Sequence, residues 1–135
     1  MKKIIPAFAL GMLMASCGSQ QAGINLSGEW KVTTINGTQV PKTLNEPAIS
    51  FDTEKSTFSG VTGVNIMNGQ YKLSDTKLTF SDAPTTMMMA DSISMVVEET
   101  YIKALKSVAT VSEENGVITL KDNDGKSVMT LQKKN

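Results

Sequence analysis

From Leu26 onward, apolar and polar residues alternate along the chain in short runs. Alternation with a period of two places one face of a β-strand in a core and the other face in water. The runs lie at residues 26–33, 49–52, 70–74, 78–81, 118–121 and 129–132. Asn-Gly or Asp-Gly pairs, which supply the positive φ angles of tight turns, begin at Asn36, Asn68, Asn115 and Asp124. The pattern therefore predicts half-buried antiparallel strands joined by hairpins.

Residues 91–108 follow a different period. Their apolar side chains recur at the three- and four-residue spacing that aligns them on one face of an α-helix. Asp91 or Ser92 can cap the start of this helix, and Glu99 stands four residues before Lys103. We expect the whole apolar stripe to pack on the core. It consists of Ile93, Val96, Val97, Thr100, Tyr101, Ala104, Leu105 and Val108.

Together these elements predict a mainly β (α+β) fold with about six to eight antiparallel strands and one amphipathic helix at about residues 91–108. About four strands precede the helix and two or three follow it. The sheet either stays open or closes into a barrel, and the helix covers one face or one mouth of it.

The N-terminal residues do not fit this pattern. A short basic start and an apolar run over residues 4–14 precede small residues, and the run is too short to span a bilayer of about 30 Å as a helix. This is the order of a secretory signal peptide, and Met14-Ala15-Ser16-Cys17 resembles the bacterial lipobox, whose cysteine is acylated. The alternative is an ordinary cleaved signal with a cysteine nearby. The predicted organisation is a signal peptide over 1–16, acylated Cys17 with a flexible spacer over 17–24, and a β-rich domain over 25–135.

The predicted lipid tethers the domain to a membrane. Residues 18–23 are small and polar, and they reach about 20 Å if extended. No acidic residue follows Cys17 directly, which under the sorting rules of enteric bacteria favours the outer membrane, facing the periplasm. Exposure on the cell surface is the alternative. We expect a monomer whose partner is an envelope protein or peptide.

Composition narrows the possible functions. Thirteen lysines balance thirteen acidic residues, and the chain has no arginine and no histidine. Nucleic-acid binding relies on clustered cations and bidentate arginines, so we expect no nucleic-acid partner. Without histidine the chain lacks the usual general base near neutral pH and the commonest metal ligand. We predict no enzymatic activity, no catalytic residues, no cofactor and no metal.

Several short motifs follow one another along the domain. They are LSGEW at 26–30, ING at 35–37, PAISF at 47–51, GVTGVN at 60–65, GQY at 69–71, LTF at 78–80 and TTMMMA at 85–90. Their order and spacing resemble the META domain (HslJ-like) family of bacterial envelope proteins. The resemblance implies a small lipocalin-like barrel or sheet with one helix, often secreted or lipid-anchored. Family members have been linked to heat shock, motility and antibiotic tolerance, and no shared catalytic mechanism accompanies the name.

The chain departs from this family at two positions. Family members usually carry Gly-Cys-Asn and Met-Ala-Cys, where this chain has Gly63-Val64-Asn65 and Met89-Ala90-Asp91. If the two positions are close in the fold, the resemblance implies that a thiol pair or covalent link has been lost as a unit. A redox role suggested by the resemblance is therefore not expected here.

The glycine-containing segment 60–65 is the candidate for a small-ligand or peptide contact, through Gly63 and Asn65. A Walker phosphate loop needs a lysine and a hydroxyl residue after its last glycine, and Val64 and Asn65 stand there instead. The glycines are thus expected to mark a bulge or a corner where the sheet bends.

Three other segments each have a chemical interpretation and a structural one. Met87-Met88-Met89, with Met95, could offer thioethers to Cu(I), but we expect these side chains to fill the gap between helix and sheet. Residues 122–125 resemble the start of a calcium loop without its closing glutamate, so we expect a hairpin turn. Thr85-Thr86 could form an anion nest, but we expect plain hydrogen bonds from the hydroxyls to the loop backbone.

These observations predict a lipid-anchored envelope protein with a non-catalytic domain and a binding or structural role in stress tolerance. Two alternatives remain. One is a lipocalin-like carrier of a small apolar ligand, and the other is an inhibitor of an envelope enzyme. A carrier requires a void among Trp30, Phe51, Tyr71 and Phe80, and we expect the interior to be filled because aromatic residues are few.

Overall fold

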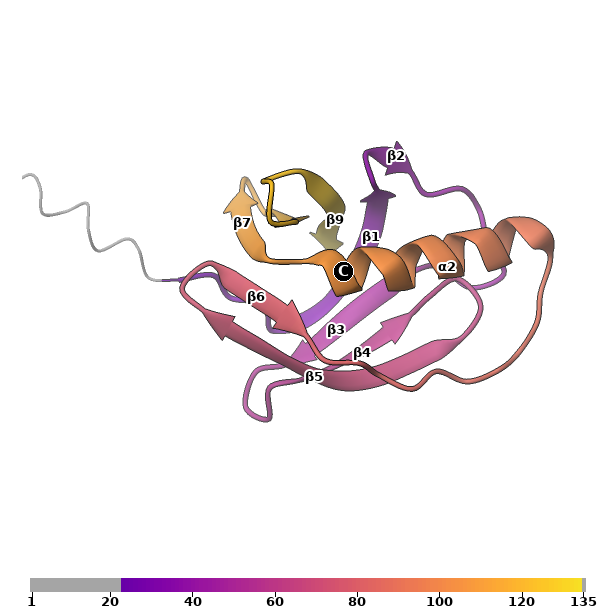
Figure 1. Cartoon of the computed structure of the whole chain (residues 1–135), viewed down its shortest axis with the longest axis horizontal. Helices are drawn as coiled ribbons and strands as arrows, with labels where there is room; N and C mark the ends of the chain where they lie inside the picture. The colour runs from indigo at the N-terminus through magenta and orange to yellow at the C-terminus, as the bar shows by residue number, and fades with distance from the viewer. Residues whose placement is uncertain (1–22, 135) are drawn as a thin grey trace, which may run out of the picture.

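A computed structural model describes residues 23–134 of the chain. The predicted signal peptide and the acylation site at Cys17 lie outside these residues. Figure 1 shows strands curving around a common interior, with one helix lying across them. The elements are β1 (Gly28–Ile35), β2 (Thr38–Gln39), β3 (Ala48–Asp52), β4 (Thr57–Val61), β5 (Ile66–Ser74), β6 (Lys77–Phe80), α2 (Ser92–Ser107), β7 (Thr110–Glu114), β8 (Val117–Lys121) and β9 (Ser127–Lys133).

The antiparallel sheet closes into a barrel. Its order is β1-β3-β4-β5-β6-β7-β8-β9, and β9 pairs with β1 again. The predicted mainly β fold with one helix is therefore confirmed, in its closed form. Six strands precede the helix rather than about four, because β2 is a two-residue strand beside the end of β1 and because residues 57–61 form a strand that the pattern did not reveal.

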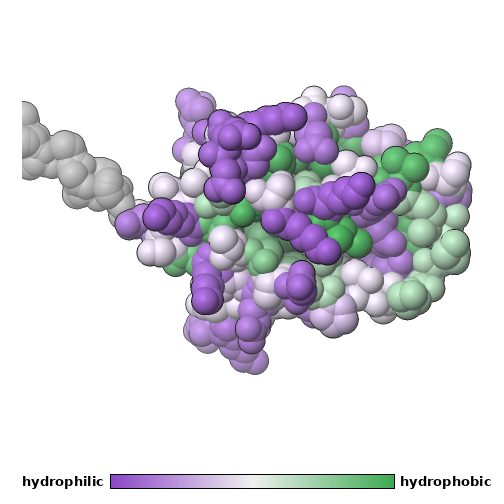
Figure 2. Space-filling view, viewed as in Figure 1, coloured by the Kyte–Doolittle hydropathy of each residue, from purple (hydrophilic) through white to green (hydrophobic). Residues whose placement is uncertain are grey.

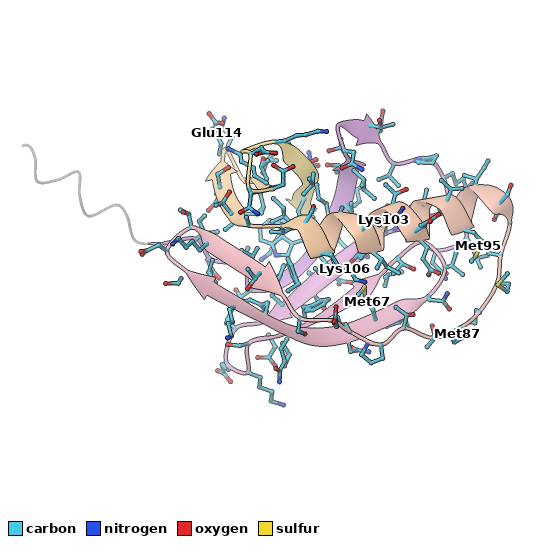
Figure 3. All side chains as sticks on the ribbon, viewed as in Figure 1. Met67, Met87, Met95, Lys103, Lys106 and Glu114 are labelled. Atoms are coloured by element: carbon cyan, nitrogen blue, oxygen red, sulfur yellow. The ribbon has the colours of Figure 1, made fainter. Side chains whose placement is uncertain are left out.

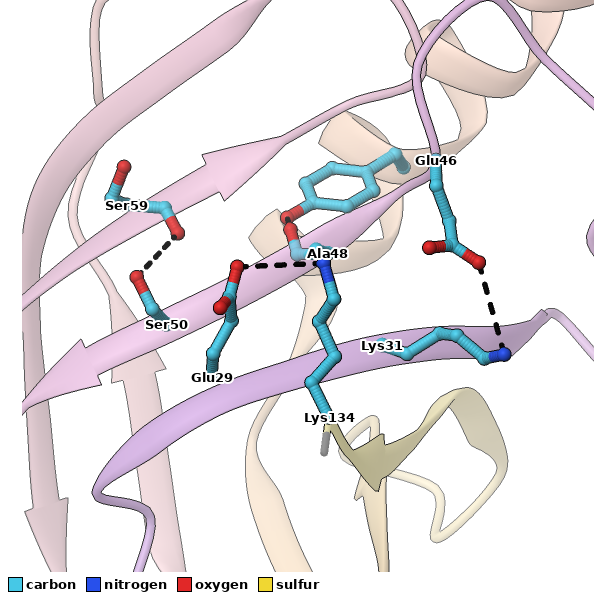
Figure 4. Close-up of polar contacts among 8 residues, drawn as sticks. Glu29, Lys31, Glu46, Ala48, Ser50, Ser59 and Lys134 are labelled. Atoms are coloured by element: carbon cyan, nitrogen blue, oxygen red, sulfur yellow. Dashed lines mark hydrogen bonds and ion pairs between the residues drawn. The ribbon is translucent and has the colours of Figure 1, made fainter.

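Backbone pairing between β1 and β9 closes the barrel, and side chains make further contacts there. The ammonium of Lys133 lies 4.7 Å from the centre of the Trp30 ring, and the indole N–H of Trp30 donates to the carbonyl of Leu26, just before β1, at 2.8 Å. An ion pair of 3.6 Å joins Lys134 to Glu29 nearby (Figure 4). The pairing register shifts between Val32 and Thr34, a β-bulge that returns Ile35 to the interior three residues after Val32.

Asn68-Gly69 is not the turn that the sequence predicts. Both residues lie inside β5, and the turn comes later, at Asp75, whose φ is 56°. Gly69 instead allows a close approach between segments. A Cβ there would lie 2.8 Å from the Cβ of Ala83 and 2.9 Å from the Phe58 ring. The other predicted Asn-Gly and Asp-Gly turns are present, with positive φ at Asn36, Asn115 and Gly125.

Helix α2 follows the predicted boundaries. Asp91 caps its start, and the chain leaves the helix at Val108. The Tyr101 side chain is fully buried, and its hydroxyl donates to the Ala48 carbonyl of β3 at 2.7 Å. Burial raises the pKa of Tyr101 far above its ordinary value, so the phenol stays protonated. The predicted exposed pair is also present, with 3.7 Å between Lys103 and Glu99.

The prediction that the whole apolar stripe of α2 packs on the core is wrong at its N-terminal end. Ile93 is 57% exposed and Val96 is 60% exposed, whereas Ser94 is fully buried. The first turns of the helix extend past the strands, so they have less core beneath them. Thr100 is half-buried, and the other members of the stripe pack inward: Val97, Tyr101, Ala104, Leu105 and Val108.

Side chains fill the barrel interior. The rings of Phe51 and Tyr71 pack edge to face with centroids 5.1 Å apart, and Phe58 and Phe80 pack similarly at 5.0 Å. One continuous apolar cluster joins every barrel strand to α2, and it includes Trp30. This packing does not favour the carrier alternative, which needs an open void among these aromatic residues.

Candidate functional site

The connection between β4 and β5 forms a tight corner, residues 62–65. Thr62 and Asn65 are buried there although they are polar. Gly63 has a φ of 112°, a conformation that favours glycine, and a Cβ at this position would touch Val97 at 3.4 Å. Gly60, just before the corner, leaves room for the Tyr101 hydroxyl. The predicted corner is therefore present where the sequence places it.

The Asn65 amide joins this corner to the loop before α2. Its Oδ1 accepts from the backbone N–H of Met88 at 2.7 Å and from the Thr86 hydroxyl at 2.8 Å. Its Nδ2 donates to the Met88 carbonyl at 3.1 Å and to the Glu98 carboxylate at 2.9 Å. Asn65 is 2% exposed, and its amide makes all of these hydrogen bonds within the protein. We call these bonds the Asn65 clamp.

Glu98 completes the connection from the helix side. Its carboxylate accepts hydrogen bonds from the Thr62 hydroxyl and from both the backbone N–H and the Nδ2 of Asn65. Corner, loop and helix are thus joined by one set of bonds. The carboxylate is directed at these donors, so its role here is to hold the corner to α2.

A second set of bonds fixes the start of α2. The Asp91 carboxylate accepts from the backbone N–H of Ser94 at 2.9 Å and from its hydroxyl at 2.8 Å. These hydrogen bonds, led by the backbone one, lower the pKa of Asp91. The Ser94 oxygen in turn accepts from the Leu44 N–H at 2.9 Å. The segment before β3 is therefore attached to the first turn of α2.

Both predicted contact residues lie in this corner. Gly63 shapes the backbone, and Asn65 spends its amide on the clamp, so neither presents an unsatisfied polar atom to a ligand. A role for them in ligand contact stays a prediction. Sequence reasoning missed Glu98 and Ser94, whose hydrogen bonds depend on which helix positions face the corner.

Val64 and Asp91, the two positions at which the resemblance implies cysteines, belong to this same neighbourhood. The Val64 carbonyl accepts from Nδ2 of Asn45 at 2.9 Å. The adjacent residue, Leu44, bonds to Ser94, which bonds to Asp91. Hydrogen bonds thus connect the segments that contain Val64 and Asp91.

The methionine run does not fill a gap, and that prediction is wrong. Met87, Met88 and Met89 are 89%, 56% and 79% exposed, and Figure 3 shows Met87 at the edge of the molecule. The loop before α2 runs along the outside of the barrel, because the Asn65 clamp holds the backbone of Met88 while the three side chains remain in water.

All the large apolar side chains that are exposed among residues 23–134 lie around this corner. Hydrogen bonds place Ile66 beside Thr86, and Leu44 beside the first turn of α2. Figure 2 shows apolar colour gathered at this side of the molecule. We call this surface the apolar end. It consists of Leu44, Ile66, Met87, Met88, Met89, Ile93 and Val96.

A groove of about 510 Å³ continues the apolar end between the β1–β2 hairpin and α2. Val40 and Pro41 line one wall, and Ile93, Val96 and Val97 line the other. Ile35 also contributes to the lining. The groove is open to solvent and separate from the filled barrel interior.

Three of the four segments that form the apolar end carry no charge, and the fourth, around Leu44, carries Lys42 and Glu46. Residues 60–70, 83–90 and 92–97 contain no Lys, Asp or Glu, although charged residues make up 19% of the chain. The carboxylates of Asp91 and Glu98, which adjoin the uncharged segments, are engaged by the hydrogen bonds described above. Depletion of charged residues and enrichment in methionine are among the features that distinguish the centres of protein interfaces from other surface.

The described chain begins on the opposite side of the barrel. Gly23 and Ile24 lie beside Thr53, Ser56 and Leu73, near the turns that join β3 to β4 and β5 to β6. The corner lies at the other end of β4, about 17 Å along a strand of five residues. In Figure 1 the start of the domain and the start of α2 accordingly lie at opposite ends of the molecule.

The remaining candidate segments have structural roles. Asp122 begins the β8–β9 hairpin, and its carboxylate accepts from the N–H groups of Asp124 and Lys126, both at 2.9 Å. The Thr86 hydroxyl accepts from the Ile66 N–H at 3.1 Å, as expected for hydrogen bonds to loop backbone. Across residues 23–134, no three His, Cys, Asp or Glu side chains gather as metal ligands. Within the same range, no helix has both the length and the apolarity that crossing a membrane requires.

Comparison with known proteins supports the resemblance seen in the motifs. The sequence model of the META domain matches residues 24–135. No curated protein matches the chain.

Solved structures share the fold. A protein whose structure was determined by NMR is 28% identical, with a TM-score of 0.60 over 78% of this chain and 88% of that one. An NMR structure of a protein from Burkholderia xenovorans is 20% identical, with a TM-score of 0.61 over 81% and 83% of the two chains. The crystal structure of a DUF4847 family protein from Bacteroides vulgatus is 15% identical, with a TM-score of 0.60 over 82% and 95%.

Proposed function

The chain belongs to the META domain family, and from that premise we propose that it is a non-catalytic, lipid-anchored protein of the bacterial envelope that binds a protein partner through its apolar end. The observation that carries the binding role is the gathering of seven exposed apolar side chains, six of them on segments without charge. Exposed apolar side chains gathered into one contiguous patch are often an interaction site. We propose that binding of this partner helps the cell to tolerate stress on its envelope.

The lipid anchor rests on the sequence. The basic start, the short apolar run and the Met14-Ala15-Ser16-Cys17 motif support cleavage before Cys17 and acylation of its thiol. The described domain begins at the end of the barrel opposite the apolar end, so attachment through Cys17 leaves the apolar end accessible to a partner. We propose the periplasmic side of the outer membrane as the location.

The composition of the apolar end bears on the nature of the partner. Six of its seven exposed apolar side chains lie on segments without Lys, Asp or Glu, and the groove of about 510 Å³ beside α2 continues the same surface. The occupant we propose is therefore an apolar, uncharged segment of a second envelope protein, with the groove beside α2 receiving its side chains.

Site-specific photo-cross-linking in living cells tests the binding role. A cross-linking residue at Val96, in the groove, should give a discrete heterologous adduct, and the same residue at Thr79, on the exposed face of β6, should not. The adduct should disappear when Ile93→Lys is added to the variant that carries the cross-linking residue in place of Val96. An adduct of twice the chain mass would identify a second copy as the occupant. Equal adducts from Val96 and Thr79 would contradict a specific site.

Acyl labelling tests the anchor independently. Radiolabelled or alkyne-tagged palmitate should be incorporated into the wild-type protein, which should fractionate with membranes. The Cys17→Ala variant should incorporate no label and leave the membrane fraction. A Cys17→Ala protein that fractionates unchanged would disprove anchoring through this residue.

A further inference from the structure

The side chains that oxidants attack most readily are distributed very unevenly in this domain. Cys17 is the chain's one cysteine, so the sulfur atoms of residues 23–134 all belong to methionines. Met67 and Met129 are buried, and so are the aromatic residues Trp30, Tyr71 and Tyr101. Met95 is half-buried. Within the described range, the methionines that stand mostly in water are Met87, Met88 and Met89.

The Asn65 clamp keeps these three side chains outside. Both backbone polar groups of Met88 are bound to the Asn65 amide, at 2.7 Å for the N–H and 3.1 Å for the carbonyl. Turning the loop so that the methionines pack inward would break these bonds. Their exposure is thus a fixed property of the fold rather than the result of a loosely placed loop.

We propose that Met87, Met88 and Met89 are a reversible oxidation site, and that their conversion to sulfoxides switches off the apolar end. The oxidant is a two-electron species of the hypochlorous acid or peroxide class. A lone pair of the thioether sulfur attacks the chlorine of hypochlorous acid, and water replaces the chlorine. The sulfur gains one oxygen and loses two electrons, and chloride and a proton are released. A methionine sulfoxide reductase returns the thioether with two electrons and two protons from cysteine thiols, which become a disulfide, and the oxygen leaves as water.

Oxidation changes the surface without changing the fold. A sulfoxide is polar, so three of the seven side chains of the apolar end would lose their apolar character. None of the three packs in the core, which leaves the barrel intact. The switching half of the proposal rests on the proposed binding role, whereas the site itself does not.

Peptide mapping by mass spectrometry tests the site. The full-length lipidated protein in detergent is treated with increasing hypochlorous acid, and each methionine is scored for a gain of one oxygen. We expect about tenfold more sulfoxide at Met87, Met88 and Met89 than at Met67 and Met129 at low dose. The unfolding temperature should not change at that dose. Uniform oxidation of all methionines, or unfolding that accompanies the first oxygen, would overturn the proposal.

The Val96 cross-link tests the switch separately. Hypochlorous acid applied to cells should abolish the adduct in the wild type. It should spare the adduct in the variant Met87→Leu/Met88→Leu/Met89→Leu, which keeps apolar side chains but cannot form sulfoxides. Loss of the adduct in both proteins, or in neither, would overturn the switch. If untreated cells give no adduct, the proposed binding role and the switch fail together, while the mapped oxidation site still stands on its own result.

Discussion

Replacing Asn65 with alanine should destabilise the domain by about 3 kcal/mol. The amide makes three hydrogen bonds to neutral groups, worth about 0.5–1 kcal/mol each, and one set to a carboxylate, worth about 1.5 kcal/mol or more. We take the lower end of these values because Thr86 and Met88 are exposed and water can replace part of what they lose. For a domain of this size, such a loss lowers the unfolding temperature by about 10 °C.

Denaturant unfolding followed by the fluorescence of Trp30 measures this effect, since the indole is buried and is the chain's single tryptophan. The midpoint should fall while the slope stays unchanged. Asn68→Ala is the matched control. Its side chain is exposed on β5, and the change should cost less than about 0.5 kcal/mol.

Hydrogen exchange adds a local measurement. The amide of Met88, protected by Asn65 in the wild type, should exchange faster in Asn65→Ala. If Asn65→Ala and Asn68→Ala unfold at the same denaturant concentration, Asn65 does not hold the corner and the loop together as described.

Two further predictions concern the helix. The lowered pKa of Asp91 means that its cap stabilises the fold above the ordinary aspartate pKa and is lost as pH falls through the lowered value. Asp91→Asn keeps a capping oxygen but cannot be protonated in this range. Its unfolding temperature should therefore fall less than that of the wild type as the pH is lowered. Identical profiles of unfolding temperature against pH would contradict the assignment. Gly60→Ala should destabilise the protein because its methyl meets the Tyr101 hydroxyl, and Tyr101→Phe should relieve part of that cost. Tyr101→Phe alone should lower the free energy of unfolding by about 1–2 kcal/mol, because its hydrogen bond to Ala48 is lost. If the effects of Gly60→Ala and Tyr101→Phe on the free energy of unfolding add strictly in the double variant, the two side chains do not touch.

The strand pattern and the helix could be read from the sequence because each depends on local periodicity. Alternation marked most of the strands, and the spacing over residues 91–108 gave the helix its true ends. The closing of the sheet could not be read, since it depends on pairing between β1 and β9 at opposite ends of the domain. Gly69 was misleading because close packing, here against Ala83 and Phe58, selects glycine as strongly as a turn does.

The candidate site was predictable in part. The glycines of the corner and the presence of Asn65 could be noticed, but the partners of its amide lie about twenty to thirty positions away in the chain. Helical spacing shows which side chains share a face, but it does not show how far the core extends beneath that face. Ile93 and Val96 therefore read as core positions although they lie beyond the barrel.

The central claim is that the apolar end is a binding surface. It is tested most directly by measuring the affinity of the lipidated protein, reconstituted in nanodiscs, for the purified partner captured at Val96. Val96→Lys should weaken binding by about tenfold or more, because it places a charge in an apolar contact. Thr79→Lys, which adds the same charge to the barrel wall, should leave the affinity unchanged. Equal affinities for the wild type and Val96→Lys would contradict the claim.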